Sequence, residues 1–228
     1  MLTDLWTEIL PALRSGVWIT IQVTALAAAW GTVVAVVLGV ASLSPVRPLR
    51  WLIRAYVEVL RGVSAVILLF WVFFALPRVG PSLTPMQAGV LALGLNLSAY
   101  GTEIVRGAVQ AVPQGQTEAA VAVNLSTLQR IWSVTLPQAA VTILPPYGSL
   151  LIEVMKASAL VSLINLDDIM FVARDLRNQA DSPSSVTIFV AVLILYFIIA
   201  YGITTVVRLL ERRFGRGLDT GRMAAAVK

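Results

Sequence analysis

The chain has 228 residues, of which 58% are apolar and 13% charged, and its mean hydropathy is +0.84. Soluble domains carry about a quarter charged residues, so this composition excludes a cytosolic enzyme and predicts an integral membrane protein. The sequence contains neither cysteine nor histidine, which excludes disulfides, thiol catalysis, and imidazole bases or ligands. The net charge of +5 is interpreted as a signal of membrane topology rather than of nucleic-acid binding.

Apolar stretches with few charged residues predict five membrane-spanning helices, over residues 14–43, 51–77, 86–111, 137–165 and 184–208. The first is expected to be a retained helix rather than a cleaved signal peptide, because Asp4 and Glu8 precede it and its apolar stretch is longer than a signal core. Pro145-Pro146 should kink the fourth helix. Residues 166–183 carry many charges and are expected to form a polar loop or a short surface helix.

Five crossings place the two termini on opposite sides of the membrane. Cytoplasmic loops carry an excess of Arg and Lys, so the positions of the basic residues decide the orientation. With the N-terminus outside, the cytoplasmic segments hold most of them: Arg47, Arg50, Arg54, Arg106, Arg130, Arg208, Arg212, Arg213, Arg216, Arg222 and Lys228. The sequence therefore predicts an all-α integral membrane protein, N-out and C-in, with residues 1–228 as a single transmembrane domain.

The longest cytoplasmic connection, residues 112–136, has a pattern of its own. Glu118-Ala119-Ala120 predicts a short helix with an acid near its N-terminal end, where the helix dipole favours negative charge. Asn124 interrupts this helix, and Ser126-Thr127-Leu128-Gln129 matches a capping box that starts a second one. Two short helices at a bend, one of them exposing small side chains, are suited to fill a groove on another protein.

This connection resembles the EAA loop of ABC importer permeases of the polar amino-acid (His/Glu/Gln/Arg/opine) class. The matching residues are Pro113-Gln114-Gly115-Gln116-Thr117-Glu118-Ala119-Ala120 and Leu136-Pro137-Gln138-Ala139. Other segments resemble the signatures of the same class, namely 56–62, 99–107, 156–160 and 210–213. The resemblance implies the type I ABC importer permease fold (MetI-like) in a bacterial inner membrane. It also implies that an ATPase is contacted through Gly115, Glu118, Ala119, Ala120, Asn124, Leu136 and Pro137.

The sequence departs from this class at three places. Asn124 replaces the glycine of the loop, and because Asn tolerates the left-handed conformation best after Gly, the bend should survive. Val63-Ser64 stands where Thr-Pro is usual, and Ala157-Ser158-Ala159 where Asp-Thr-Ser is usual. The last two changes affect the membrane region and bear on the substrate, which the resemblance gives as a polar amino acid or a compatible solute. This mixture also resembles the ectoine/hydroxyectoine branch.

The resemblance assigns the chain a transport role with no catalytic residue and no metal site of its own. The chain has no Gly-x-x-x-x-Gly-Lys-[Ser/Thr] loop to hold nucleotide phosphates, so ATP and Mg are expected on separate ATPase subunits. The other expected partners are a second permease copy or a paralogue, an extracytoplasmic solute-binding protein and membrane lipid, with no nucleic acid.

Three acid–base pairs at i, i+3 spacing fall within the predicted spans: Glu58/Arg61, Glu103/Arg106 and Glu153/Lys156. One interpretation is mutual neutralisation, since an unpaired charge at the bilayer centre costs about 2.5–3.5 kcal/mol on insertion scales. It is favoured for the first two pairs, near the cytoplasmic ends. Glu153 and Lys156 lie deeper, and with Ser158 they are also candidates to contact a zwitterionic solute in the transport pathway.

Two other classes of function are weighed against the ABC permease. An ion-coupled secondary transporter of small solutes predicts inverted repeats and unpaired buried acids, neither of which is visible here. An intramembrane enzyme needs a nucleophile with a base or a metal cluster, and the acids do not converge in the sequence. Copurification of an ATPase subunit would separate the permease from both.

Overall fold

The computed structural model describes residues 9–179 and 184–215. Within these ranges all the regular elements are helical, which confirms the predicted class. The α-helices are α2 (Leu10–Ala41), α3 (Arg47–Gly62), α4 (Ala65–Phe70), α5 (Pro85–Gln110), α6 (Gln114–Ala122), α7 (Thr127–Arg130), α8 (Leu136–Ala157), α9 (Ile169–Asn178) and α10 (Ser185–Gly215). Short π or 3-10 segments occur at Trp71–Ala75, Leu76–Arg78, Ile131–Thr135 and Ser158–Ile164.

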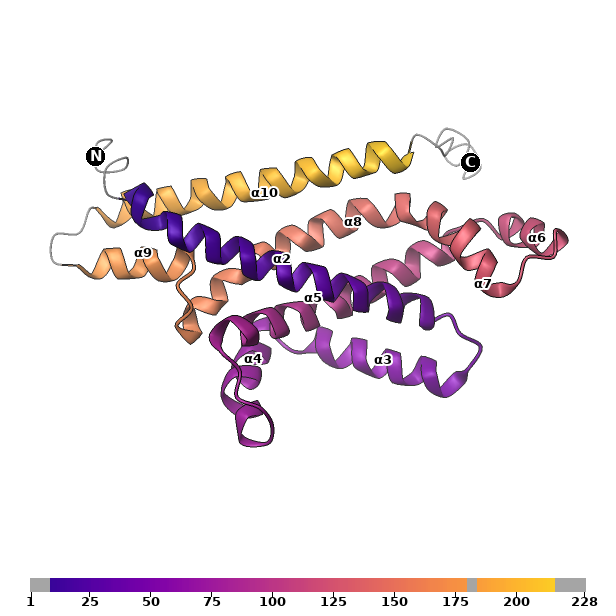
Figure 1. Cartoon of the computed structure of the whole chain (residues 1–228), viewed down its shortest axis with the longest axis horizontal. Helices are drawn as coiled ribbons and strands as arrows, with labels where there is room; N and C mark the ends of the chain where they lie inside the picture. Colours follow the sequence, from indigo (N-terminus) through magenta and orange to yellow (C-terminus); the bar gives the residue numbers. More distant parts are fainter. Residues whose placement is uncertain (1–8, 180–183, 216–228) are drawn as a thin grey trace.

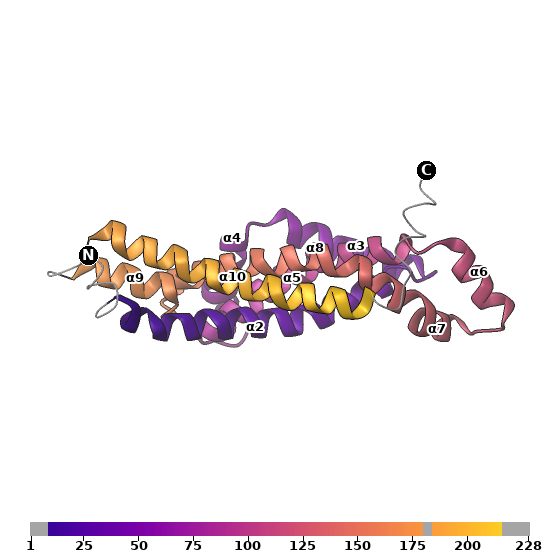
Figure 2. The ribbon, with the colours of Figure 1, turned by 90° about the horizontal axis from the view of Figure 1, so that it is seen from above.

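The long helices α2, α5, α8 and α10 run along the long axis of the molecule (Figures 1 and 2). Four helical segments are long and apolar enough to cross a membrane: Leu10–Ala41, Pro85–Gln110, Ile131–Ile164 and Ser185–Phe214. A fifth span results if the bent pair Arg47–Gly62 and Ala65–Arg78 crosses as one. Helices α6 and α7 lie at the end of the molecule where α10 finishes, and α9 lies at the opposite end (Figure 1).

The second expected helix, over 51–77, is not continuous. Helix α3 begins earlier, at Arg47, and ends at Gly62, and the helical chain that follows is bent from it by 103°. Val63 and Ser64 at the break both have extended backbones, with ψ of 134° and 139°. Gly62, at the end of α3, lowers helix stability. The sequence has no proline at Val63 or Ser64 that would have predicted the break. The direction of α4 is set by packing, because its buried Leu68 and Leu69 join the core cluster that also contains Leu93 and Leu97 of α5.

Helices α2 and α5 form the closest pair in the bundle. A Cβ added to Gly31 of α2 would lie 2.8 Å from the carbonyl oxygen of Gly94 on α5, and one added to Gly101 would lie 2.7 Å from Ala35. Small residues at such crossings let helix backbones approach closely in membranes. The indole nitrogen of Trp30 also donates to the carbonyl oxygen of Val90, at 3.1 Å. Helices α3, α4 and α8 pack against this pair, whereas α10 packs on α8 and α9.

Helix α8 continues through Pro145 and Pro146 as one element and passes into the 3-10 segment Ser158–Ile164. Tyr147, one residue further along, is buried and donates its hydroxyl proton to Thr32 Oγ1 of α2, at 2.7 Å. The 3-10 segment ends at Asn165, which adopts the left-handed conformation with φ of 59°. This residue redirects the chain into α9.

The charged stretch after α8 contains a helix that is half buried, rather than a purely polar loop. Ile169 and Ala173 of α9 are fully buried, and they pack with Leu13 of α2 and Ile188 of α10 in a second apolar cluster. Asp168 caps this helix, because its Oδ1 accepts a hydrogen bond from the backbone nitrogen of Phe171 at 2.9 Å. The expected short surface helix therefore forms, but one of its faces belongs to the core.

Asp168 is itself fully buried, and its second carboxylate oxygen has no hydrogen-bond partner. Desolvation by this burial raises the pKa of Asp168 to about 6, although the backbone hydrogen bonds at the helix start and the charge of Arg174 act in the opposite direction. The folded chain thus holds the Asp168 proton more tightly than the unfolded chain, in which the ordinary value is near 3.8. This difference links stability to pH.

Replacement Asp168→Asn is expected to stabilise the detergent-solubilised protein at pH 7.5 and to leave it unchanged near pH 4. In the parent chain the favourable contribution of the Asp168 proton is present below pH 4 and is lost as the pH rises through 6. The amide keeps the cap and cannot ionise, so the gain at pH 7.5 should reach roughly 3 kcal/mol. Thermal melts between pH 4 and pH 8 measure it. Asp175→Asn, at an exposed position of the same helix, is the control, and equal pH profiles for both variants would contradict the assignment.

Candidate functional site

A polar groove follows α3, α5 and α8 along one side of the molecule. It consists of three cavities, of about 640, 380 and 240 Å³. The first and third cavities share Glu103, while the second and third share Arg61, Tyr100 and Glu153. The three cavities therefore adjoin one another along α3, α5 and α8, and together we call them the groove.

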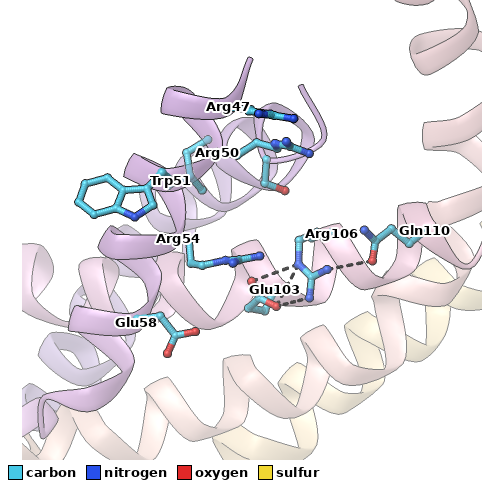
Figure 3. A pocket seen from close by; sticks show the side chains of 10 residues that line it. Arg47, Arg50, Trp51, Arg54, Glu58, Glu103, Arg106 and Gln110 are labelled. Atoms are coloured by element: carbon cyan, nitrogen blue, oxygen red, sulfur yellow. Dashed lines mark hydrogen bonds and ion pairs between the residues drawn. The ribbon is translucent and has the colours of Figure 1, made fainter. Parts of the chain in front are cut away.

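The largest section of the groove lies between α3 and the C-terminal part of α5 (Figure 3). Arg47, Arg50 and Arg54 come from α3, at spacings of three and four residues that place them on one helix face. Figure 3 shows Arg54 pointing toward Glu103 and Arg106 of α5, whereas Trp51 points away from them. This end of the groove is thus strongly basic.

Glu103 and Arg106 form the ion pair that their spacing predicts. Arg106 Nη2 lies 2.6 Å from Glu103 Oε2, and Arg106 Nε donates to both carboxylate oxygens at 3.1 and 3.2 Å. The remaining guanidinium nitrogen donates to Gln110 Oε1 at 2.9 Å. Such a bidentate, charge-assisted arrangement holds Arg106 in a fixed orientation beside the arginines of α3.

The expected Glu58–Arg61 pair does not form. Within the described residues the Glu103–Arg106 contact is the one ion pair shorter than 4.0 Å. The Arg61 guanidinium instead lies over the ring of Tyr100 on α5, with 5.2 Å between its central carbon and the ring centroid. Arg61 thus contacts Tyr100 on α5 instead of Glu58 on its own helix, because a cation is attracted to the face of an aromatic ring.

Glu153 and Lys156 line different cavities and are not paired. Glu153 faces the groove together with Arg61 and Asn96, whereas Lys156 borders a separate, largely apolar cavity between α8 and α10. Ser158 is fully buried, and its hydroxyl donates to the carbonyl oxygen of Met155 at 2.7 Å. Of the three residues expected along a solute pathway, only Glu153 lies in the groove.

The second feature of interest is the pair of short helices α6 and α7. They project beyond the long helices at one end of the molecule in both views (Figures 1 and 2). Gln138 of α8 donates to Gln116 of α6 at 3.2 Å, which ties the projecting part to the bundle. We call residues 113–137 the coupling region.

The bend of the coupling region has the geometry that its sequence predicts. Asn124 adopts the left-handed conformation, with φ of 58°. The Asn124 nitrogen donates to the Val121 carbonyl and the Leu125 nitrogen to the Ala120 carbonyl, at 2.9 and 3.1 Å, which is the Schellman pattern of a helix end. Ser126 and Gln129 then exchange the two hydrogen bonds of a capping box, at 2.9 and 3.3 Å.

Replacement Asn124→Gly is expected to be neutral or mildly stabilising, whereas Asn124→Val should weaken binding of the ATPase that the resemblance implies. Glycine adopts positive φ without cost, while a β-branched residue in this conformation is strained by about 1–2 kcal/mol. The measurement is pull-down of the ATPase by each variant at equal expression. Equal recovery with both would show that the bend does not position the coupling region.

The exposed side of the coupling region combines an acid, small residues and apolar side chains. Glu118, Ala119 and Gly115 are exposed, while Ala120 is buried against the rest of the region. Large apolar side chains on the same region are also exposed: Val121, Val123 and Trp132. Of the two remaining predicted residues, Pro137 is exposed and Leu136 is partly buried, both at the start of α8. An apolar surface of this kind is suited to a protein partner.

Sequence reasoning did not identify Tyr100 and Asn96 as groove residues. Both lie on α5, and Asn96, Tyr100 and Glu103 follow one another at spacings of four and three. This helical periodicity of polar side chains within an apolar span was the available signal. No local pattern in the sequence indicated which side chains of other helices lie near Arg61.

A family model described as "Binding-protein-dependent transport system inner membrane component" matches residues 31–216. A probable amino-acid ABC transporter permease protein, y4tF of Sinorhizobium fredii, is 43% identical over 90% of this chain and 88% of its own length. The L-cystine transport system permease protein TcyB of Bacillus subtilis is 31% identical, with coverage of 90% and 88%. The arginine transport system permease protein ArtQ of the same organism is also 31% identical, with coverage of 90% and 93%.

Solved structures show the same architecture. The crystal structure of an amino acid ABC transporter with histidines contains a chain that superposes with a TM-score of 0.79 and is 30% identical, covering 89% of this chain and 94% of that one. An inward-facing MetNI methionine ABC transporter gives a TM-score of 0.76 at 22% identity, with coverage of 91% and 98%. The second comparison bears on the fold alone.

Proposed function

Since this chain belongs to the family of binding-protein-dependent transport system inner membrane components, we propose that the groove along α3, α5 and α8 is the path its solute takes across the membrane. The chain is an amino-acid ABC transporter permease subunit of the inner membrane, and such subunits are not enzymes. The observation that carries the proposal is that Arg61, Glu153 and the Glu103–Arg106 pair line adjoining cavities of the groove.

Charged side chains within membrane spans are costly and commonly mark a solute or ion path. Arg61 lies 14 residues beyond the start of α3, which corresponds to about 21 Å along the helix. Glu153 of α8 lines the same two cavities as Arg61. By contrast, α10 exposes large apolar side chains that suit lipid: Leu193, Phe197, Ile198 and Val206. The groove is therefore the side of the molecule best suited to a polar solute.

The charges in the middle of the groove match the two ends of an amino acid. Arg61 can donate to a carboxylate, while Glu153 can accept from an ammonium group. In this proposal Arg61 supplies the cation for a zwitterionic solute, the role for which the sequence suggested Lys156. The named relatives above carry amino-acid assignments, and they lend no support to the ectoine/hydroxyectoine branch.

One chain supplies only one wall of such a path. Arg61, Glu58 and Glu153 are exposed in the isolated chain, and a second permease copy or a paralogue facing the groove would enclose them. We therefore propose a paired permease, in which residues 1–228 of each chain act as a single transmembrane domain.

The family implies ATPase partners and a solute-binding protein. We propose that the ATPase, which would hold ATP and Mg, docks on the coupling region through Glu118, Ala119 and the exposed apolar residues beside them. The solute-binding protein would then meet the opposite end of the molecule, near α9. An ion-coupled secondary transporter is not favoured, since such a carrier needs no ATPase.

Purification of the membrane complex tests the proposal. Mass spectrometry should identify an ATPase with this chain, together with a second copy of it or a paralogous permease. Proteoliposomes of the complex should take up amino acids only with ATP inside and the solute-binding protein outside. Uptake driven by an ion gradient without ATP would instead establish a secondary carrier.

A further inference from the structure

The first turn of α9 is packed closely against α2. A Cβ added to Gly16 of α2 would lie 2.8 Å from the carbonyl oxygen of Asp168, and the backbone nitrogen of Ile169 donates to Thr20 Oγ1 at 3.3 Å. Asp168 itself is fully buried. The close approach of the two backbones therefore holds the Asp168 carboxyl in the interior of the bundle.

No basic group is in contact with the Asp168 carboxyl. Arg174 of the same helix is the basic residue whose charge acts on it, but Arg174 Nη2 donates to the carbonyl oxygen of Ser162, at 2.8 Å. Among the described residues no ion pair within 4.0 Å includes Asp168. The side chains that approach from α2 and α10 are the hydroxyls of Thr20 and Tyr196. A site without a countercharge favours the uncharged form of a carboxyl.

Tyr196 of α10 offers the partner that an uncharged Asp168 needs. Its hydroxyl lies near enough to interact with Asp168, yet the hydroxyl and Asp168 Oδ2 are the two buried side-chain atoms without a hydrogen-bond partner in the described part of the chain. Buried polar atoms are rarely left unpaired. A proton on Oδ2 can be donated to the Tyr196 oxygen, while the phenol proton is directed to the nearby hydroxyls of Ser158 and Thr20.

We propose that the Asp168 carboxyl and the Tyr196 hydroxyl form a proton-dependent latch, which fastens α9 to α10 while Asp168 carries its proton and loosens when the proton leaves. The carboxylate has no countercharge in its buried position, and it becomes hydrated when α9 separates from its neighbours. Because α9 lies at the end of the molecule opposite the coupling region (Figure 1), the latch responds to the pH on that side of the membrane. It is independent of the solute path, since neither residue lines the groove.

The pH range of the latch follows from the pKa of Asp168, which burial raises from 3.8 to about 6. Closed α9 binds the proton more tightly than open α9, so the gain from closing is complete below pH 4 and is lost as the pH rises through 6. Between pH 5 and pH 8 the equilibrium constant for opening should increase about tenfold.

Hydrogen exchange read by mass spectrometry on the assembled complex measures this opening. Exchange in peptides of α9, corrected for the intrinsic effect of pH on amide exchange, should become about tenfold less protected between pH 5 and pH 8, while peptides of α5 stay unchanged. Asp168→Asn keeps the cap and cannot ionise, so it should remove this pH dependence. Asp175→Asn, at an exposed position of α9, is the matched control and should retain it.

Tyr196→Phe tests the other half of the latch. At pH 5 it should lower the protection of α9 about fivefold, the usual effect of one lost hydrogen bond, and at pH 8 the effect should be smaller because the parent has already lost the proton. Equal effects at both pH values would overturn the pairing with Tyr196. Protection of α9 in the parent that does not change with pH would overturn the latch as a whole, and would leave the proposed solute path untouched.

Discussion

Solute uptake by a complex carrying Glu118→Lys is expected to fall at least about tenfold, although the chain should still insert and fold. Glu118 is exposed on α6, at the end of the molecule that projects beyond the spans, so its replacement removes no packing contact in the chain. Reversing one charge at a docking surface costs the favourable contact and adds repulsion, and a tenfold loss corresponds to only about 1.4 kcal/mol. The measurement is uptake by proteoliposomes together with pull-down of the ATPase.

Two variants control this experiment. Glu118→Asp keeps the charge and should retain most of the uptake. Asp175→Lys makes the same reversal on an exposed position of α9 at the opposite end of the molecule, and should leave ATPase pull-down unchanged. Normal uptake by a well-expressed Glu118→Lys complex would remove Glu118 from the coupling surface.

Arg61→Gln and Glu153→Gln are each expected to lower uptake by about tenfold or more, because each removes one charge-assisted contact to a zwitterion, worth about 1.5–3 kcal/mol. Solute binding to the external receptor should not change, since neither residue belongs to that protein. Uptake by proteoliposomes and thermal stability in detergent are measured side by side. Lys156→Gln, three residues from Glu153 on the same helix but lining another cavity, is the matched control and should transport normally.

The double variant separates two explanations of these losses. If Arg61 and Glu153 merely neutralise each other, replacing both should restore uptake, because removing an ion pair together is often close to neutral. If they bind the two ends of a solute, the double variant should remain stable and stay inactive. Recovered uptake in the double variant would therefore assign both residues a structural role only.

The coupling region could be predicted from the sequence because its structure is local. Asn124 adopts positive φ at the end of α6, and Ser126 and Gln129 exchange hydrogen bonds, all through residues that are at most five positions apart. Such contacts depend on the identity of near neighbours rather than on the path of the rest of the chain. The membrane spans could also be predicted from the sequence, because the length of an apolar stretch must match the thickness of a bilayer.

The groove depended on the tertiary structure. Helical spacing predicted three acid–base pairs, but only Glu103–Arg106 formed. Spacing of three or four residues makes two side chains neighbours on a helix surface, and it gives no information about competing partners on other helices. Arg61 lies over the ring of Tyr100, and Glu153 lines the same cavities as Arg61, whereas Lys156 lines another one.

The bend of 103° after α3 is another feature that depended on the tertiary structure rather than on the local sequence. Composition determined that this stretch is apolar enough to enter a membrane, yet no residue in it requires a turn at Val63 and Ser64. The turn follows from where Leu68 and Leu69 can be buried against α5. Local chemistry thus predicted the helical spans and the bend at Asn124, whereas the groove arose only where packing brought α3, α5 and α8 together, because burial and cross-helix contacts are properties of the assembled chain.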